Sequence, residues 1–158
     1  MAIASTGEYA DFQALTKKLK KLAEESRLYD DGIKYSVQEY ANYLAHLAYQ
    51  ARNDFNPYYN TTILAGFENG EPFLGSVDHL GNYFHKDYAL AGFAGYFCKP
   101  LLNAEWSKDG TEEEAKATIY KCFQVLFSRD CHSVDNIRFA VISDKGVKIE
   151  EPIHIPLQ

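Results

Sequence analysis

The strongest fold signal in the chain is the stretch TTILAGFENGEPFLGSV, residues 61–77. Residues 61–67 are β-branched or apolar and predict a strand, and residues 72–77 predict a second one. Asn69-Gly70 lies between them, and both central residues of a type I′ turn need a positive φ, which Asn and Gly tolerate. The stretch therefore predicts an antiparallel hairpin.

An amphipathic helix is predicted on the N-terminal side of this hairpin. Ser5 and Glu8 have the spacing of a capping box, so we expect the chain to open directly on a helix. Residues 30–32, Asp-Asp-Gly, end it. Between these points apolar side chains recur every three or four residues and form one stripe, at Phe12, Leu15, Leu19 and Leu22.

A second helix repeats this pattern. Ser36 and Glu39 form another capping box, and Asn56-Pro57 ends the helical region. The short turn between the two helices predicts an antiparallel helix pair. The apolar positions of the second helix are Val37, Tyr40, Ala41, Leu44 and Leu47.

Beyond the hairpin, the sequence predicts a third strand and a short helix. The chain turns at Gly81-Asn82 and continues as a strand over residues 83–85, with residues 89–94 as its extension. A short helix is expected over residues 96–106, because Pro100 is tolerated near a helix start.

The C-terminal third predicts one long helix and one hairpin. Thr111 and Glu114 give a third capping box. Residues 137–141 alternate, residues 144–146 turn, and residues 147–150 alternate on the way back. The apolar face expected for the helix consists of Ala115, Ile119, Cys122, Phe123 and Leu126.

The order of elements indicates an α+β fold in one domain, residues 1–158. A helix pair, three strands, a second helix pair and a hairpin predict antiparallel sheets covered by helices, not βαβ winding. About five strand segments are recognisable. Two packed sheets covered by helices normally need more.

Composition narrows the function classes. The net charge of −6, from 16 Lys and Arg against 22 Asp and Glu, is poorly matched to a phosphate backbone, so we expect no nucleic-acid partner. No apolar run is long enough to span a membrane, and the start of the chain does not resemble a signal peptide. Three cysteines indicate reduced thiols of the cytosol or nucleus.

Two clusters have the residue types of a catalytic site. Cys131-His132 with Asp135 suggests a nucleophile and a base, but catalytic pairs usually meet through the fold and not as sequence neighbours. Ser76 and Asp78 share one face of a strand while His79 lies on the other, which does not suit a triad. Ordinary loop and strand residues are the favoured interpretation of both clusters.

Metal chemistry has no support in the sequence. The five histidines show none of the spacings typical of zinc ligands, and no glycine pattern fits a phosphate-binding loop. No motif therefore defines an active site.

Seven collinear segments resemble a known family. In order, they are GEYADFQ (7–13), DGIKYS (31–36), NPYYNT (56–61), GEPFLGSVD (70–78), KPLL (99–102), KCFQVLFSRD (121–130) and KGVKIE (145–150). They resemble the proteasome beta subunits, and among them the beta type-4 group, which occupies the seventh beta position of the eukaryotic 20S core. The resemblance covers nearly the whole chain.

The resemblance implies a fold and a role. It implies the N-terminal-nucleophile hydrolase fold, a four-layer αββα sandwich, with a place in one of the two inner beta rings. It implies a non-catalytic structural subunit, without catalytic, cofactor-binding or metal-binding residues and without a cofactor. The implied partners are beta subunits of the same and the opposite ring and subunits of the alpha rings. The implied setting is ubiquitin-dependent protein degradation in the cytoplasm and nucleus.

The chain departs from the family pattern in three places. It resembles an N-terminally truncated member, and we expect the first strands, which carry the threonine nucleophile, Asp and Lys of active relatives, to be absent. Where active relatives have Gly-Ser-Gly, residues 93–95 are Phe-Ala-Gly. The Asp-x-x-Ser motif of active relatives is kept by Asp130 and Ser133. The tail, residues 155–158, is shorter than the family's clamp to the opposite ring.

Two other functions stay open at this point. One is a divergent threonine-type endopeptidase subunit whose nucleophile lies upstream of this chain. The other is a free-standing binding module derived from the same fold. The genomic frame upstream of Met1 tests the first, and the mass of the endogenous protein in its native complexes tests the second.

The expected loss of strands leads to a prediction about the polypeptide on its own. Unpaired backbone at a sheet edge and an uncovered apolar face both promote association. We therefore expect the chain, expressed without partners, to aggregate or to depend on partners for folding. Size-exclusion chromatography followed by a thermal melt is the measurement, and a cooperative melt of a soluble monomer contradicts the prediction.

Overall fold

The computed structural model describes residues 1–156. The chain divides into two compact units: unit 1 comprises residues 1–89 and 142–146, and unit 2 comprises residues 90–141 and the chain from Val147 onward. Leu157 and Gln158, which belong to the tail discussed above, lie outside the described residues.

Unit 1 contains a four-stranded sheet formed by β1 (Ala2–Gly7), β2 (Asn60–Glu68), β3 (Glu71–Val77) and β4 (Tyr83–His85). The strands lie in the order β1-β2-β3-β4, and every neighbouring pair is antiparallel. The predicted hairpin is confirmed. Asn69 has φ 53° and Gly70 has φ 86°, as a type I′ turn requires.

The start of the chain corrects the prediction that it opens on a helix. Residues 2–7 form β1, which pairs with β2 from Ala2↔Ala65 to Gly7↔Asn60. Ser5 does not cap a helix, because its hydroxyl donates to Thr61 O at 3.2 Å and lies 3.0 Å from Thr62 Oγ1. Glu8 is the N-cap instead, and its carboxylate accepts from Ala10 N.

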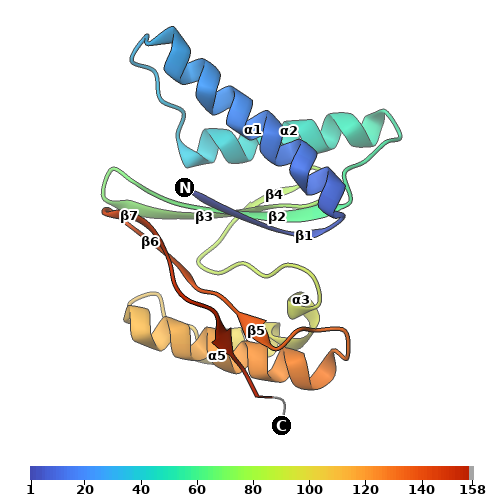
Figure 1. Cartoon of the computed structure of the whole chain (residues 1–158), viewed down its shortest axis with the longest axis vertical. Helices are drawn as coiled ribbons and strands as arrows, with labels where there is room; N and C mark the ends of the chain where they lie inside the picture. Colours follow the sequence, from blue (N-terminus) through green and yellow to red (C-terminus); the bar gives the residue numbers. More distant parts are fainter. Residues whose placement is uncertain (157–158) are drawn as a thin grey trace. The chain divides into compact units, whose positions relative to one another are not determined.

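Two long helices cover one face of this sheet (Figure 1). They are α1 (Tyr9–Tyr29) and α2 (Val37–Asn53), and both were predicted. The capping box of Ser36 and Glu39 is complete, with the Glu39 carboxylate accepting from Ser36 N at 2.7 Å. The helices cross as they run back over the sheet, which confirms a helix pair (Figure 1).

The core of unit 1 lies between these helices and the sheet. Leu64 is fully buried, and the side chains packed around it come from both helices and from β3. Gly66 allows α2 to approach β2, because a Cβ on Gly66 would overlap Cγ2 of Val37. Along β2, residues facing the helices are buried and those between them are half-buried, so the two faces of the sheet differ. The buried core residues are Leu15, Leu19, Val37, Ala41, Leu44, Leu47, Ala48, Leu64 and Val77.

Unit 2 begins with two short helices. The sequence predicted a strand extension over residues 89–94 and one helix over residues 96–106. Residues 89–93 form no strand, and α3 (Ala94–Phe97) starts directly after them. The helix expected over residues 96–106 is two pieces, since α3 ends at Cys98 and α4 (Lys99–Glu105) follows with Pro100 in its first turn. A proline at this position lacks an N–H that the first turn does not need.

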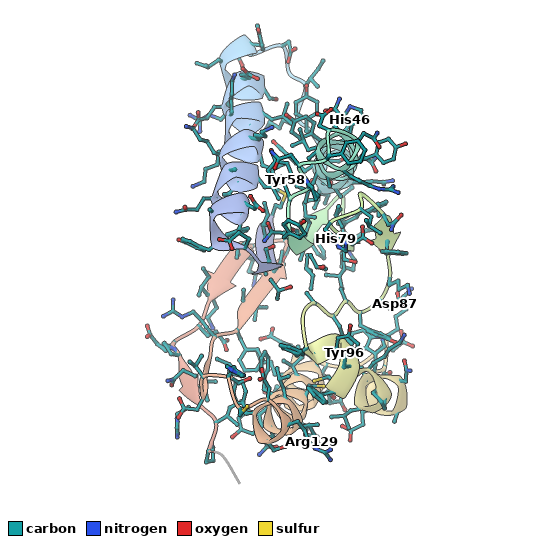
Figure 2. The ribbon with its side chains drawn as sticks, turned by 90° about the vertical axis from the view of Figure 1, so that its right-hand side faces the viewer. His46, Tyr58, His79, Asp87, Tyr96 and Arg129 are labelled. Atoms are coloured by element: carbon teal, nitrogen blue, oxygen red, sulfur yellow. The ribbon has the colours of Figure 1, made fainter. Side chains whose placement is uncertain are left out.

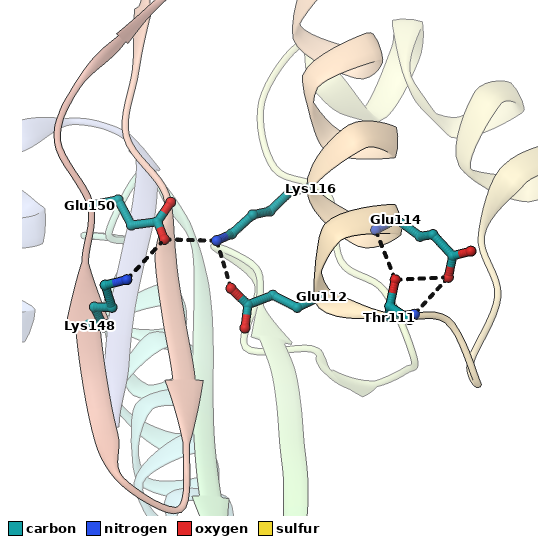
Figure 3. A network of polar contacts seen from close by, with 6 residues as sticks. All are labelled: Thr111, Glu112, Glu114, Lys116, Lys148 and Glu150. Atoms are coloured by element: carbon teal, nitrogen blue, oxygen red, sulfur yellow. Dashed lines mark hydrogen bonds and ion pairs between the residues drawn. The ribbon is translucent and has the colours of Figure 1, made fainter.

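The long helix α5 (Glu112–Arg129) has the predicted capping box of Thr111 and Glu114. Its buried face differs from the prediction. Thr118, Cys122 and Phe127 are buried, whereas Ile119 is exposed. Figure 3 shows Lys116 of α5 bonding Glu112 at 2.6 Å and Glu150 at 2.8 Å, so one ammonium connects the helix to the segment after the final hairpin.

The C-terminal strands are shorter than predicted. They are β5 (Asn136–Ile137), β6 (Ala140–Ser143), β7 (Gly146–Ile149) and β8 (Ile153–His154). β6 and β7 form the expected hairpin around residues 144–145. β5 does not belong to it, because Asn136 and Ile137 pair with β8. The described residues contain eight strands, whereas about five were recognisable in the sequence. The additional strands are β1, β8 and the separate β5, which was predicted to be continuous with β6.

The contact between Gly66 and Val37 leads to a stability prediction. Gly66→Ala places a methyl group inside the Val37 side chain, so we expect a loss of roughly 1 to 3 kcal/mol in the free energy of unfolding. The measurement is the urea midpoint by pulse proteolysis at low protein concentration. Gly95→Ala is the control, because a Cβ there meets nothing within 4 Å and no loss is expected. Equal midpoints for both variants would contradict the prediction.

Candidate functional site

The structure does not assemble Cys131, His132 and Asp135 into a catalytic group. Cys131 Sγ lies 3.6 Å from His132 Nδ1, and both side chains are exposed. Asp135 is directed elsewhere, since its Oδ2 lies 3.2 Å from Nδ1 of His154. The carboxylate nearest to His132 belongs to Asp130, whose Oδ1 lies 3.8 Å from the same Nδ1 that faces Cys131. One ring nitrogen cannot both take a proton from the thiol and donate to a carboxylate, so these contacts do not make a catalytic relay.

Asp78 is committed to the loop between β3 and β4. Its Oδ1 accepts from Leu80 N and Asn82 N, both at 2.9 Å, and its Oδ2 accepts from Asn82 Nδ2 at 2.8 Å. Partial burial acts to raise the pKa of Asp78, but the hydrogen bonds from Asn82 and Leu80 outweigh it and hold the pKa below its ordinary value. The carboxylate thus orients the loop, through the amides of Leu80 and Asn82.

Asp130 and Ser133 form a closed turn after α5. Ser133 Oγ donates to Asp130 Oδ2 at 2.8 Å, and Asp130 Oδ1 accepts from His132 N at 3.1 Å. These hydrogen bonds, with that from Ser133 the largest, lower the pKa of Asp130. Asp130 and Ser133, the predicted Asp-x-x-Ser pair, therefore lie within hydrogen-bond distance and bond each other.

The histidines are distributed over the molecule. Figure 2 shows His46 on α2 and His79 on the loop after β3. His85 stacks on Phe73, with ring centroids 5.1 Å apart. Among residues 1–156, no group of three or more His, Cys, Asp or Glu side chains could hold a metal ion.

Two of the three thiols are buried in unit 2. Cys98 Sγ donates to the carbonyl oxygen of Cys122 at 3.2 Å. Burial raises the pKa of both thiols, and the neighbouring Cys98 helps to raise the pKa of Cys122 to about 12. Both therefore remain protonated, and thiols in that state are poor nucleophiles.

Asn60 is a structural residue that the sequence analysis did not identify. It is 5% exposed, and its Nδ2 donates to Thr6 O at 3.2 Å and to Glu8 O at 3.0 Å. Glu8 N donates in turn to Tyr59 O at 3.0 Å. These bonds fix the passage from β1 into α1 against the start of β2. Its position in the segment NPYYNT, which carries the resemblance, is the one signal that pointed to it.

The helix α2 ends in an unusual way. Phe55 N donates to Arg52 O at 3.1 Å and Asn56 N donates to Ala51 O at 2.9 Å, the two bonds of a Schellman motif. Phe55 adopts φ 56°, a left-handed conformation that costs a residue other than Gly about 1 to 2 kcal/mol. Its side chain is 97% exposed.

Phe55 belongs to a larger set of exposed apolar side chains. Tyrosine and phenylalanine are enriched in the cores of protein interfaces, and large apolar side chains on a surface mark contact sites when they cluster. No helix among residues 1–156 is long and apolar enough to cross a membrane. The exposed aromatic side chains are Tyr9, Tyr29, Tyr35, Tyr49, Phe55, Tyr59, Phe84, Phe93 and Tyr96.

Comparison with known proteins identifies the family. Residues 1–142 match the family model described as "Proteasome subunit". The chain belongs to the proteasome subunit family. That family has the N-terminal-nucleophile hydrolase fold, and the mixed α and β structure with antiparallel sheets agrees with it.

Similar individual proteins include beta type-4 subunits of three organisms. The chain is 34% identical to proteasome subunit beta type-4 of Arabidopsis thaliana over 95% of its length. It is 36% identical to the Dictyostelium discoideum subunit of the same name over 97%, and 33% identical to that of Xenopus laevis over 96%. The match covers 61%, 60% and 63% of these relatives, so the chain spans about three-fifths of their length.

The segment before α3 contains no hydroxyl among residues 93–95, where Phe93 precedes α3 and Ala94 begins it. The Phe93 side chain is exposed. That residues 93–95 and the pair Asp130 and Ser133 correspond to motifs of active relatives stays a prediction from the resemblance.

The bonds of Asp78 lead to a pH prediction. The folded pKa lies below the ordinary 3.8, so the stabilisation is present above that value and is lost as the pH falls through the folded pKa. Below about pH 4 we expect faster hydrogen exchange at the amides of Leu80 and Asn82, corrected for intrinsic rates. Asp78→Asn should remove this pH response, because the amide does not titrate. The same acid response in both proteins would contradict the role of Asp78.

Proposed function

We propose that the chain is a non-catalytic structural beta subunit of the 20S proteasome core. The observation that carries this proposal is the identity of 33–36% to three beta type-4 subunits across 95–97% of the chain. In this role, the chain helps to build a beta ring and contributes to ubiquitin-dependent protein degradation by the whole complex. The setting that follows is the cytoplasm and nucleus.

The non-catalytic part of the proposal is supported by how the family's polar groups are used. Ser133 and Asp130 bond each other, and Asp78 bonds its own loop. The hydrogen bonds hold the pKa of Asp130 below its ordinary value, so this carboxylate is a weak base for the Ser133 hydroxyl. The resemblance places Ala94 where active relatives have a serine, and alanine supplies no hydroxyl.

The proposed partners are beta subunits of the same and the opposite ring and subunits of the alpha rings. Obligate interfaces commonly bury about 2,000 Å² or more and favour aromatic side chains. Exposed tyrosines of α1, α2 and α3 supply such side chains, and they are Tyr9, Tyr29, Tyr49 and Tyr96. The proposal also treats residues 1–158 as one beta-type domain of the four-layer αββα class.

The test is incorporation into the particle. An affinity-tagged copy of the chain is expressed in eukaryotic cells, intact proteasomes are purified through the tag, and native mass spectrometry counts the subunits. We expect the chain in particles that contain alpha and beta subunits in stoichiometric amounts. We also expect Ser133→Ala particles to keep the peptidase activity of wild-type particles, because Ser133 serves only its turn.

Gly7→Ala is the control for a native fold. Gly7 has φ 113° and a Cβ there would overlap Tyr59 O, so this variant should not be incorporated. Recovery of the wild-type chain only as a free monomer would refute the proposal and favour a free-standing module. If a covalent probe for N-terminal threonine labels this chain, the result would refute the structural role and favour a threonine endopeptidase subunit.

A further inference from the structure

The end of α2 carries a bulky aromatic residue where the backbone favours glycine. The two Schellman bonds place Phe55 at the position after the helix cap, with φ 56°. Glycine is the usual residue there, because a Cβ is strained in the left-handed region. Phe55 therefore does not improve the stability of its own chain at this position.

The other left-handed residues of the chain follow the ordinary rule. Apart from glycines, residues 1–156 contain two more positive φ values, at Asp30 after α1 and at Asn69 in the hairpin turn. Asp and Asn adopt this conformation more readily than other residues with a side chain. Phe55 is the exception. Burial of its ring does not offset the cost of the left-handed backbone, because Phe55 is 97% exposed.

Phe55 lies at an end of unit 1 that presents two more exposed rings. Tyr9 begins α1 and Tyr59 precedes β2, and they are 69% and 66% exposed. Glu8 N donates to Tyr59 O at 3.0 Å, which joins the start of α1 to the segment that runs from Phe55 to β2. We propose that Phe55 is an anchor that inserts into an apolar socket on a neighbouring proteasome subunit. This inference rests on the function proposed above.

The surroundings of Phe55 indicate a protein socket with a basic rim. The net charge of −6 disfavours an anionic membrane surface as the partner. Asp54 precedes Phe55 in the sequence, and its exposed carboxylate has no ion-pair partner among the described residues. Arg52 lies over the ring of Tyr49 at 5.9 Å. A buried aromatic anchor beside a carboxylate fits an apolar pocket flanked by Lys or Arg.

The experiment compares three variants of the tagged full chain in cells that also make the untagged wild-type chain. The readout is the fraction of each tagged chain recovered in intact proteasomes. For Phe55→Gly we expect a loss of about tenfold or more, because anchor rings dominate binding energy. Phe55→Trp keeps a large ring and should keep incorporation. Asp30→Gly is the matched control, since it relieves a left-handed residue without removing a ring.

A second readout separates anchoring from folding. The soluble, protease-resistant amount of tagged Phe55→Gly chain in the same cells should not fall below that of the tagged wild-type chain, because glycine suits φ 56°. A lowered soluble amount together with poor incorporation would overturn the inference, as would wild-type incorporation of Phe55→Gly. Two other results would also overturn the inference. One is binding of the wild-type chain to anionic vesicles that the Phe55→Gly variant no longer shows. The other is a Phe55→Gly variant that loses only its self-association. If the wild-type chain itself stays outside the particle, the proposed function fails instead.

Discussion

The close approach of α2 to β2 is the constraint on which unit 1 depends. Val37 fills the space beside Gly66, and this contact sets how near the helix can come to the sheet. Leu44 and Leu64 can then be almost fully buried between them. Because the interior is close-packed, a larger residue at position 66 would push the start of α2, at Val37, away from β2.

Local signals in the sequence predicted the elements that form through local contacts. The hairpin over residues 61–77 and the capping boxes at Ser36 and Thr111 each depend on residues a few positions apart, and the structure confirms them. The same rule failed at Ser5. Its spacing to Glu8 suits a cap, but its hydroxyl finds Thr61 and Thr62 across the sheet. A bond over 57 residues leaves no periodic trace in the sequence.

The candidate site shows the same division. Sequence reasoning found Asp130 and Ser133 because they are three residues apart, and the structure joins them. It did not find Asn60, whose role depends on carbonyl groups of β1 and of the first cap. It also did not mark Phe55, because left-handed helix ends are recognised in sequences by Gly or Asn. A phenylalanine in that conformation becomes visible only when φ is known.

The pairing of β1 with β2 has a consequence for synthesis on the ribosome. β1 is made before β2, and Ser5 meets Thr62 only after 57 further residues. At 5 to 20 residues per second, the synthesis of these residues takes roughly 3 to 12 seconds. During this interval the backbone groups that β1 will pair with β2 have no such partner, and they can bond to another exposed strand edge nearby. The nascent chain therefore has a time window in which a chaperone or a cognate subunit would have the greatest effect on the yield of folded protein.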